Sequence, residues 1–266
     1  MRRFTFRTLA VSAVALLTLS GCATGGDKTA TESGAKVIEP GNLTVCTHLP
    51  YKPFQFNQGG QVVGFDVDIM DLVAKELGLQ QKVINTPFEG IQSGQALNTG
   101  ECDAAAAGMT ITEDRAKVLD FSDPYFEATQ ALLVKKGSGI SGLEDLAGKS
   151  LAVQEGTTGE IYAEENAPAD TEIRTFEDLA LLTTAVKTGQ VDAGINDNGV
   201  LYDYVRSNPD TEVATEFNTG EQYGIAVQKN QNDELLATIN DVLAQAKKDG
   251  TYDRIYRKWF PDAPKQ

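Results

Sequence analysis

The stretch from Ala104 to Arg115 carries residue types that could bind a carboxylate. A run of four alanines and Gly108 is typical of a buried strand that stops at a cleft. Thr112 can cap the helix that follows, which puts Arg115 in its first turn. The planar guanidinium would then point back toward the strand end and the hydroxyl of Thr110, and such a corner fits a carboxylate. An arginine at this position is more often a surface residue, so the prediction needs support from other parts of the chain.

Residues 1–22 have the order of an export signal. MRRFTFR is basic, the apolar segment TLAVSAVALLTL is too short to span a bilayer, and Leu19-Ser-Gly-Cys22 follows at once. This order resembles a bacterial lipoprotein signal, in which the cysteine is acylated. We therefore predict a signal peptide over 1–21, lipidation of Cys22, and a protein anchored by palmitate or a similar lipid to the extracytoplasmic face of the cell membrane. The small, polar residues 23–36 predict a flexible tether.

Two further cysteines, Cys46 and Cys102, would follow the signal into an oxidising compartment, where a disulfide is the default state. They lie in or beside neighbouring predicted parallel strands, which would bring them together. Two buried free thiols are the alternative. With His48 as the only histidine, soft ligands are too few for a structural metal site, and we expect no metal and no cofactor.

The composition sets the class of protein. The chain has 266 residues, 41% of them hydrophobic and 23% charged, which suits one large or two small globular domains. The formal net charge of −15 comes without any basic run, so nucleic acid is a poor partner.

Predicted strands and helices alternate along the chain, which indicates an α/β fold with parallel sheets covered by helices. Two such sets and a return segment at 222–227 suggest two lobes with a cleft between them. The predicted strands are 43–46, 83–85, 103–107, 150–153, 173–175 and 191–195, and the main predicted helices are 65–77, 90–98, 176–187, 198–207, 232–248 and 252–260.

Several motifs in this order resemble the family 3 extracellular solute-binding proteins, the polar amino-acid receptors of bacterial ABC importers. The resemblance covers residues 43–260. Its motifs are GFDVD at 64–68, GMTITEDR at 108–115, DFSDPY at 120–125, GTTG at 156–159, VDA at 191–193 with Asp197, YGIAV at 223–227 and DGTY at 249–252.

The resemblance implies a type II periplasmic-binding-protein fold, with two α/β lobes joined by two crossing hinge strands. The first lobe would comprise 43–132 plus 228–266 and the second 133–227, after a lipidated cysteine and tether at 22–42. Ligand would close the lobes on each other, because the closed state has the higher affinity.

The resemblance also implies how an amino acid would be held. Arg115 and the hydroxyl of Thr110 would bind its α-carboxylate together with the backbone amide of Thr158. The carbonyl of Gly108 and the carboxylate of Asp197 would bind its α-ammonium. A zwitterion that leaves water needs both charges paired, so this division is physically sensible.

Aromatic residues at two positions, Tyr51 and Phe88, match those that sandwich the ligand's side chain in the family. His48 stands where family members often carry an aspartate, so a negative charge is missing there. We predict that His48 acts in specificity together with Gln154 and Glu155. This favours a neutral or acidic ligand such as glutamine or glutamate over a basic one.

The predicted function is capture of a polar amino acid by a monomeric receptor and its delivery to ABC permease subunits. The alternative is a cyclohexadienyl dehydratase-like enzyme on the same fold, which would need a carboxyl group held protonated over its substrate. Glu89 and Glu155 are the nearby candidates, and neither lies in an apolar sequence setting. We therefore predict a protein without enzymatic activity.

Overall fold

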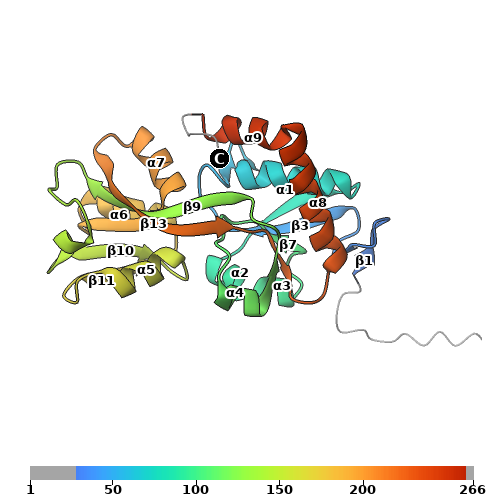
Figure 1. Cartoon of the computed structure of the whole chain (residues 1–266), viewed down its shortest axis with the longest axis horizontal. Coiled ribbons are helices and arrows are strands. Elements are labelled where there is room, and N and C mark those ends of the chain that lie inside the picture. Colours follow the sequence, from blue (N-terminus) through green and yellow to red (C-terminus); the bar gives the residue numbers. More distant parts are fainter. Residues whose placement is uncertain (1–27, 262–266) are drawn as a thin grey trace, which may run out of the picture.

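The computed structural model describes residues 28–261, which form two α/β lobes side by side. Each lobe is built on one five-stranded sheet. Figure 1 shows helices on both faces of these sheets and two long strands that run through the region between the lobes. The predicted division into two α/β lobes is confirmed.

The sheet of the first lobe has the strand order β6-β3-β7-β14-β8. β3 is parallel to β6 and β7, whereas β14 is antiparallel to both of its neighbours. Its strands are β3 (Asn42–Thr47), β6 (Gln80–Asn85), β7 (Ala104–Ala105), β8 (Leu119–Phe121) and β14 (Ala226–Gln228), and its helices are α1 (Phe65–Glu76), α2 (Phe88–Gln92), α3 (Gln95–Asn98), α4 (Glu113–Val118), α8 (Asp233–Asp249) and α9 (Thr251–Trp259).

The sheet of the second lobe has the strand order β11-β10-β12-β9-β13. β10 is parallel to β11 and β12, and the long strands β9 and β13 are added antiparallel at one side. Its elements are β9 (Phe126–Lys135), the 3-10 helix η1 (Leu143–Leu146), β10 (Ser150–Gln154), α5 (Thr158–Asn166), β11 (Glu172–Phe176), α6 (Leu179–Thr188), β12 (Ala193–Asp197), α7 (Asn198–Ser207) and β13 (Thr211–Tyr223).

The chain crosses between the two sheets twice, from β8 to β9 at 122–125 and from β13 to β14 at 224–225. β9 pairs with β12 and β13 along much of its length, so 126–132 belong to the sheet of the second lobe. The first crossing therefore lies several residues before the predicted boundary at 132, and the second lies slightly before 227. Both crossings are short, as a hinge between two bodies requires.

An aromatic cluster joins the crossing segments to the loop that precedes α1. The ring of Phe54 lies 4.8 Å from that of Phe126 and 5.3 Å from that of Tyr223, centroid to centroid. The loop can turn so closely because residue 64 is glycine: at its φ of 149°, a Cβ atom would lie 1.9 Å from the carbonyl oxygen of Phe54. α1 begins directly after this contact, so the packing fixes the loop that carries Tyr51.

Two local predictions are wrong. Residues 29–42 are not part of a flexible tether, because β1 (Thr29–Ala30) and β2 (Lys36–Val37) form a hairpin whose Val37 is buried. The predicted helix 90–98 breaks into α2 and α3 at Gly94, which has a left-handed φ of 77°. The predicted signal peptide, Cys22 and residues 23–27 of the tether lie outside the described residues. A second hairpin is formed by β4 (Phe56–Gln58) and β5 (Gln61–Val63), with its turn at residues 59 and 60.

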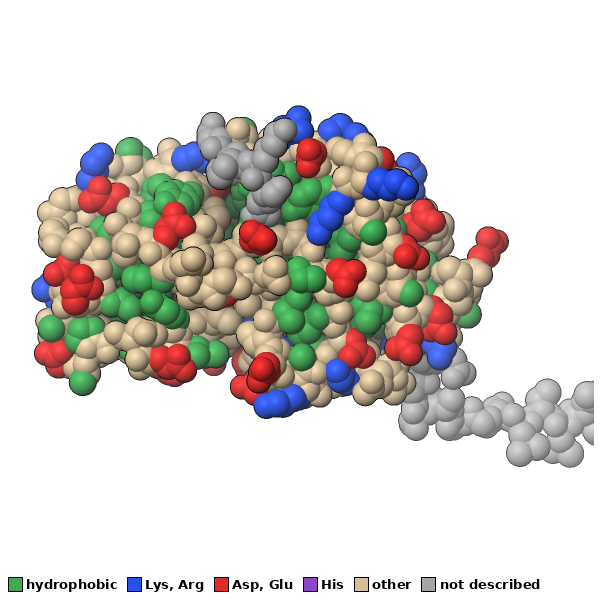
Figure 2. Space-filling view, viewed as in Figure 1, with side chains coloured by type: hydrophobic (Ala, Val, Ile, Leu, Met, Phe, Trp, Pro, Cys, Tyr) green, Lys and Arg blue, Asp and Glu red, His purple; other side chains and the backbone are tan. Residues whose placement is uncertain are grey.

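Between residues 28 and 261, no helix has the length and apolar character that crossing a membrane requires. Acidic side chains are spread over both lobes on the face drawn in Figure 2, interspersed with basic ones. This even distribution fits a solvated surface, as the sequence's net charge predicts.

Candidate functional site

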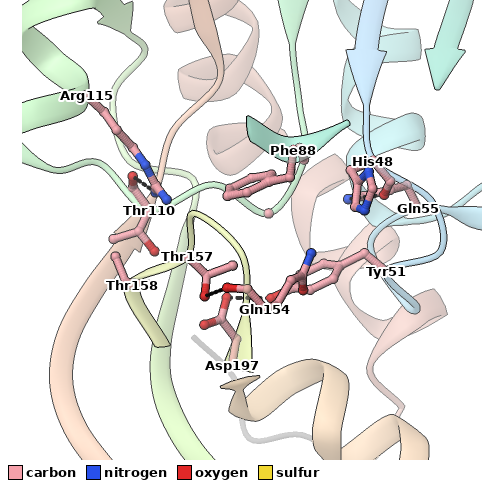
Figure 3. Close-up of a pocket in the computed structure, with 12 residues that line it drawn as sticks. His48, Tyr51, Gln55, Phe88, Thr110, Arg115, Gln154, Thr157, Thr158 and Asp197 are labelled. Atoms are coloured by element: carbon pink, nitrogen blue, oxygen red, sulfur yellow. Dashed lines mark hydrogen bonds between the residues drawn. The ribbon is translucent and has the colours of Figure 1, made fainter. Parts of the chain in front are cut away.

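A cavity lies between the lobes, at the ends of the strands that carry the predicted ligand-binding residues, with about 330 Å³ of empty space that includes its opening to solvent. Figure 3 shows side chains from both lobes turned toward it. Its lining residues are His48, Tyr51, Gln55, Phe88, Ala107, Gly108, Thr110, Arg115, Gln154, Thr157, Thr158 and Asp197.

Nine of the ten predicted ligand-binding and specificity residues therefore line one cavity. The exception is Glu155, which is exposed and does not line it. Gln55, Ala107 and Thr157 line it without having been predicted.

Arg115 is held over the cavity by contacts from both lobes. As predicted, Thr112 caps α4, its hydroxyl accepting a hydrogen bond from the backbone N–H of Arg115 (3.2 Å). The guanidinium is only 5% exposed, donates from Nη1 to the carbonyl of Thr110 (2.7 Å) and from Nη2 to that of Gly156 (2.9 Å), and lies 5.3 Å from the ring centre of Phe88. Burial lowers the pKa of Arg115, although nearby carboxylates oppose the shift. A guanidinium has five N–H donors, so donors remain for an anion.

Asp197 faces the same cavity from the carboxyl end of β12, where α7 begins. Its carboxylate is 6% exposed and accepts hydrogen bonds from the hydroxyls of Tyr51 (2.8 Å) and Tyr223 and from Nε2 of Gln130. Burial raises the pKa of Asp197 to about 6, and the negative charge of Glu221 acts in the same direction. Three of roughly four acceptor positions are filled, which leaves space for one more donor.

The backbone at Gly108 is fixed by a buried carboxylate. Asp66 accepts from the N–H of Gly108 (2.8 Å) and from the hydroxyl of Tyr125 (2.8 Å). Burial raises the pKa of Asp66 to about 6. Gly108 has a left-handed φ of 56°, and a Cβ atom there would come within 2.8 Å of the ring of Tyr51. Only glycine suits this peptide, because both the dihedral angle and the space exclude a side chain.

Glu221 in β13 is a buried acid that the sequence reasoning missed. It accepts hydrogen bonds from the hydroxyls of Thr110 (2.6 Å), Thr158 (2.8 Å) and Thr219 (3.0 Å) and from Nε2 of Gln130 (3.0 Å). The hydroxyl of Thr110, expected to hold the ligand's carboxylate, is thus directed to Glu221. The alternation of a strand was the available signal, since residue 221 lies on the same face as the aromatic residue at 223.

The other end of the cavity carries neutral polar groups. Nδ1 of His48 lies 3.1 Å from the carbonyl oxygen of Thr86, and Nε2 of Gln55 donates to the carbonyl of His48 (3.4 Å). Nε2 of His48 and Oε1 of Gln55 are buried and have no hydrogen-bond partner among the described residues. Oε1 of Gln154 accepts from Nδ2 of Asn196 (3.1 Å).

A disulfide lies behind this end of the cavity. It joins Cys46, in the last part of β3, to Cys102, with 5.6 Å between their Cα atoms. The hydroxyl of Thr86 lies 3.3 Å from Sγ of Cys46. Among the residues placed in the structure, no group of three or more histidine, cysteine or acidic side chains is arranged to hold a metal ion.

Residues 43–262 match the family model described as bacterial extracellular solute-binding proteins, family 3. A probable histidine-binding protein of Neisseria gonorrhoeae is 35% identical over 98% of this chain and 96% of its own length. The ABC transporter glutamine-binding protein GlnH of Bacillus subtilis is 42% identical over 77% of this chain and 75% of its own length. Other relatives are named as binding arginine and cystine.

Solved structures agree with these sequence relatives. An ancestral arginine-binding protein bound to glutamine has a TM-score of 0.78 and 45% identity, covering 84% of this chain and 99% of that one. The predicted type II periplasmic-binding-protein fold is confirmed. The family model spans most of the chain and the Neisseria gonorrhoeae relative matches it nearly end to end, so this chain belongs to the family 3 bacterial extracellular solute-binding proteins.

Proposed function

We propose that this protein captures a polar amino acid between its two lobes and delivers it to the permease of an ABC importer. The observation that carries the proposal is the pair Arg115 and Asp197, which bring opposite charges from different lobes to one cavity. The names of the relatives, which are amino-acid-binding proteins of transporters, support it.

The α-carboxylate would bind the free N–H donors of Arg115 and the amide of Thr158. This amide belongs to the first turn of α5, where backbone N–H groups have no partner within the helix and favour an anion. The α-ammonium would take the remaining acceptor position of Asp197 and the carbonyl of Gly108. Both charges of the zwitterion are then paired, which offsets the cost of desolvating them.

Closure is coupled to binding because these partners come from both lobes. The hydroxyl of Tyr51, from the first lobe, donates to Asp197 in the second, and Arg115 donates to the carbonyl of Gly156 in the second. An amino acid adds further bonds on both sides. It therefore stabilises the closed arrangement over any arrangement in which the lobes separate at 122–125 and 224–225.

The comparisons allow a wider range of ligand side chains than the sequence predicted. The relatives are named for histidine, glutamine, arginine and cystine, so a preference for neutral or acidic over basic ligands has no support from them. The class that we propose is a polar amino acid, with its side chain between Tyr51 and Phe88.

We also propose that the protein is a monomeric lipoprotein, anchored through Cys22 outside the cytoplasm, where its family works. Lipidation would keep the receptor beside its permease. Radiolabelled fatty acid should be incorporated into the wild-type protein and not into Cys22→Ala. Label retained in the variant would contradict this proposal.

An enzymatic role has little support. Glu89 and Glu155, the predicted acid candidates, do not line the cavity, and the carboxylate of Glu89 accepts a hydrogen bond from Gln92 (2.6 Å). Glu155 is exposed to solvent and does not face a substrate held in the cavity. Neither residue meets the requirement for dehydratase-like chemistry.

A thermal-shift screen with the twenty amino acids tests the proposed function. A ligand at 100 times its Kd should stabilise the protein by about 2.7 kcal/mol, which is a readily measured rise in Tm. The same ligand should leave Arg115→Ala unshifted. No shift with any amino acid, or an equal shift in the variant, would contradict the proposal.

A further inference from the structure

We propose that the end of the cavity formed by His48 and Gln55 is a subsite for a ligand side chain that ends in N–H donors, with an uncharged carboxamide as its best fit and a carboxylate excluded. The inference rests on the proposed function, because Arg115 and Asp197 must orient the α-groups so that the side chain reaches this end. Figure 3 shows Arg115 and His48 at opposite ends of the cavity, with Phe88 between them.

The hydrogen-bond partner of His48 fixes which ring nitrogen carries the hydrogen atom in the neutral form. Nδ1 lies 3.1 Å from the carbonyl oxygen of Thr86, and a carbonyl only accepts. Nδ1 therefore carries the hydrogen atom, and Nε2 of the neutral ring is an acceptor. His48 is 7% exposed and lines the cavity, and this Nε2 has no partner within residues 28–261.

The orientation of Gln55 is fixed in the same way. Its Nε2 donates to the backbone carbonyl of His48 (3.4 Å), and rotating the amide would put Oε1 against that carbonyl instead. Oε1 is thus a second acceptor, on a residue that is 0% exposed, and it too lacks a partner in the part of the chain that the structure describes.

A donor group from the second lobe also faces the cavity. Asn196 accepts at Oδ1 from the backbone N–H of Asp197 (2.9 Å), so its Nδ2 is the group that donates to Oε1 of Gln154 (3.1 Å). This leaves the Nε2 donors of Gln154, which also lines the cavity. Two acceptors and one donor group match the two N–H groups and one oxygen of a carboxamide.

Buried polar atoms without partners are rare and cost about 1–3 kcal/mol each, so two in one cavity indicate a missing donor. A ligand carboxylate would bring more acceptors against these two and would leave all of them unpaired. Asp197 is the one carboxylate among the described residues that line the cavity, and it is assigned to the α-ammonium, so none remains to neutralise a cationic side chain. A neutral donor group satisfies the subsite with the smallest desolvation cost.

Glutamine and glutamate are the sharpest probes, because they have the same shape and differ only in this terminal group. Isothermal titration of the full-length protein at pH 7.5 should give an affinity for glutamine at least 100-fold higher than that for glutamate. Sites built to hydrogen-bond one ligand group reject an analogue that lacks it by at least this factor. Equal or tighter binding of glutamate would overturn the inference and leave the proposed function intact. Failure of every amino acid to bind would instead refute the proposed function.

Variants of Gln55 test the assignment of the acceptor. Gln55→Met keeps the length of the side chain and removes Oε1, so the ratio of glutamine to glutamate affinity should fall about tenfold. The matched control is Gln58→Met in β4, where the glutamine is exposed, and it should leave the ratio unchanged. Gln55→Glu keeps the shape and strengthens the acceptor, so affinity for lysine should rise relative to that for glutamine. An unchanged ratio in Gln55→Met with no gain for lysine in Gln55→Glu would overturn the inference.

Discussion

The two ends of the cavity differ in how the protein treats its polar groups. At the end with Arg115 and Asp197, the groups are charged and already hydrogen-bonded to the protein: the guanidinium to two carbonyls, the carboxylate to three donors. At the end with His48 and Gln55, the groups are neutral and two of their atoms have no protein partner among the described residues. The charged end suits the α-carboxylate and α-ammonium, which all amino acids share. The neutral end suits the side chain, which distinguishes one amino acid from another.

The difference has an energetic reason. A buried charge without partners costs far more than a buried amide without partners, so the charged end must be held by the protein even when empty. The neutral end can leave acceptors unpaired at about 1–3 kcal/mol each and recover this on binding. The residues that bind the groups common to all amino acids and the residues that select the side chain can therefore change independently.

The largest expected effect is the loss of binding when the charged end is disrupted. Arg115→Ala should lower the affinity for every amino acid at least 10³-fold, because it leaves the ligand's carboxylate buried without a charged partner. Arg115→Lys should retain little, since the ammonium cannot reproduce the planar fork that also contacts Thr110 and Gly156. Calorimetry measures both, with Arg174→Ala on the exposed edge strand β11 as a control that keeps its affinity. Undiminished binding in either Arg115 variant would show that the two ends do not share one ligand.

The disulfide behind the neutral end should contribute strongly to stability. Cys46 and Cys102 are 56 residues apart, and closing such a loop stabilises the folded state by about 4 kcal/mol in the chain-entropy model. The double variant Cys46→Ala/Cys102→Ala should lose this amount in urea unfolding. Thiol counting in denaturant without reductant should find neither cysteine free in the wild-type protein. Two free thiols, or an unchanged free energy of unfolding, would contradict the prediction.

The charged end was easier to predict from the sequence than the neutral end. Thr112 and Arg115 follow from a local capping pattern, which needs only neighbouring residues. Asp197 depended on a resemblance, because its partner is 82 positions away in the chain and no local pattern joins them. Gln55 and Glu221 were not predicted from the sequence. Their roles depend on burial and on how many hydrogen-bond partners each has, and tertiary packing alone decides both.

The helices and strands also differ in how closely the sequence predicted them. Helices with caps and apolar periodicity were predicted closely, and α7 has the bounds expected for it, 198–207. The boundary between the lobes was misjudged because β9 is one continuous strand, and its sequence does not show which of the two sheets it joins. Its pairing with β12 and β13 assigns it to the second lobe, and such pairing between distant segments leaves no trace in the local sequence.

The buried carboxyl of Asp66, which holds the backbone of Gly108, should make stability depend on pH. The pKa of Asp66 is raised to about 6 by burial, so its stabilising contribution is complete below about pH 4 and is lost as pH rises through 6. Asp66→Asn can still accept from Gly108 and contact Tyr125 without a charge. The variant should therefore lack up to about 3 kcal/mol of the fall in wild-type stability between pH 4 and pH 7.5. Urea unfolding across this range measures it, and parallel curves for the two proteins would contradict the prediction.

The smallest effect concerns the pH dependence of binding. The α-ammonium needs Asp197 as a carboxylate, yet burial and the charge of Glu221 raise the pKa of Asp197 to about 6 in the empty protein. Below pH 6 a growing fraction is protonated and must lose its proton before the ligand binds. Affinity at pH 5 should therefore be about tenfold lower than at pH 7, as one pKa unit of competition requires.

Asp197→Asn should bind weakly and with a flatter profile across this range, because the titrating partner of the ammonium is gone. Calorimetry from pH 5 to pH 8 with one amino acid distinguishes the cases. The α-ammonium of that amino acid stays protonated up to about pH 8, so changes at the acid end come from the protein. A decline that persists unchanged in Asp197→Asn would show that the titrating group lies elsewhere in the protein and would contradict the prediction.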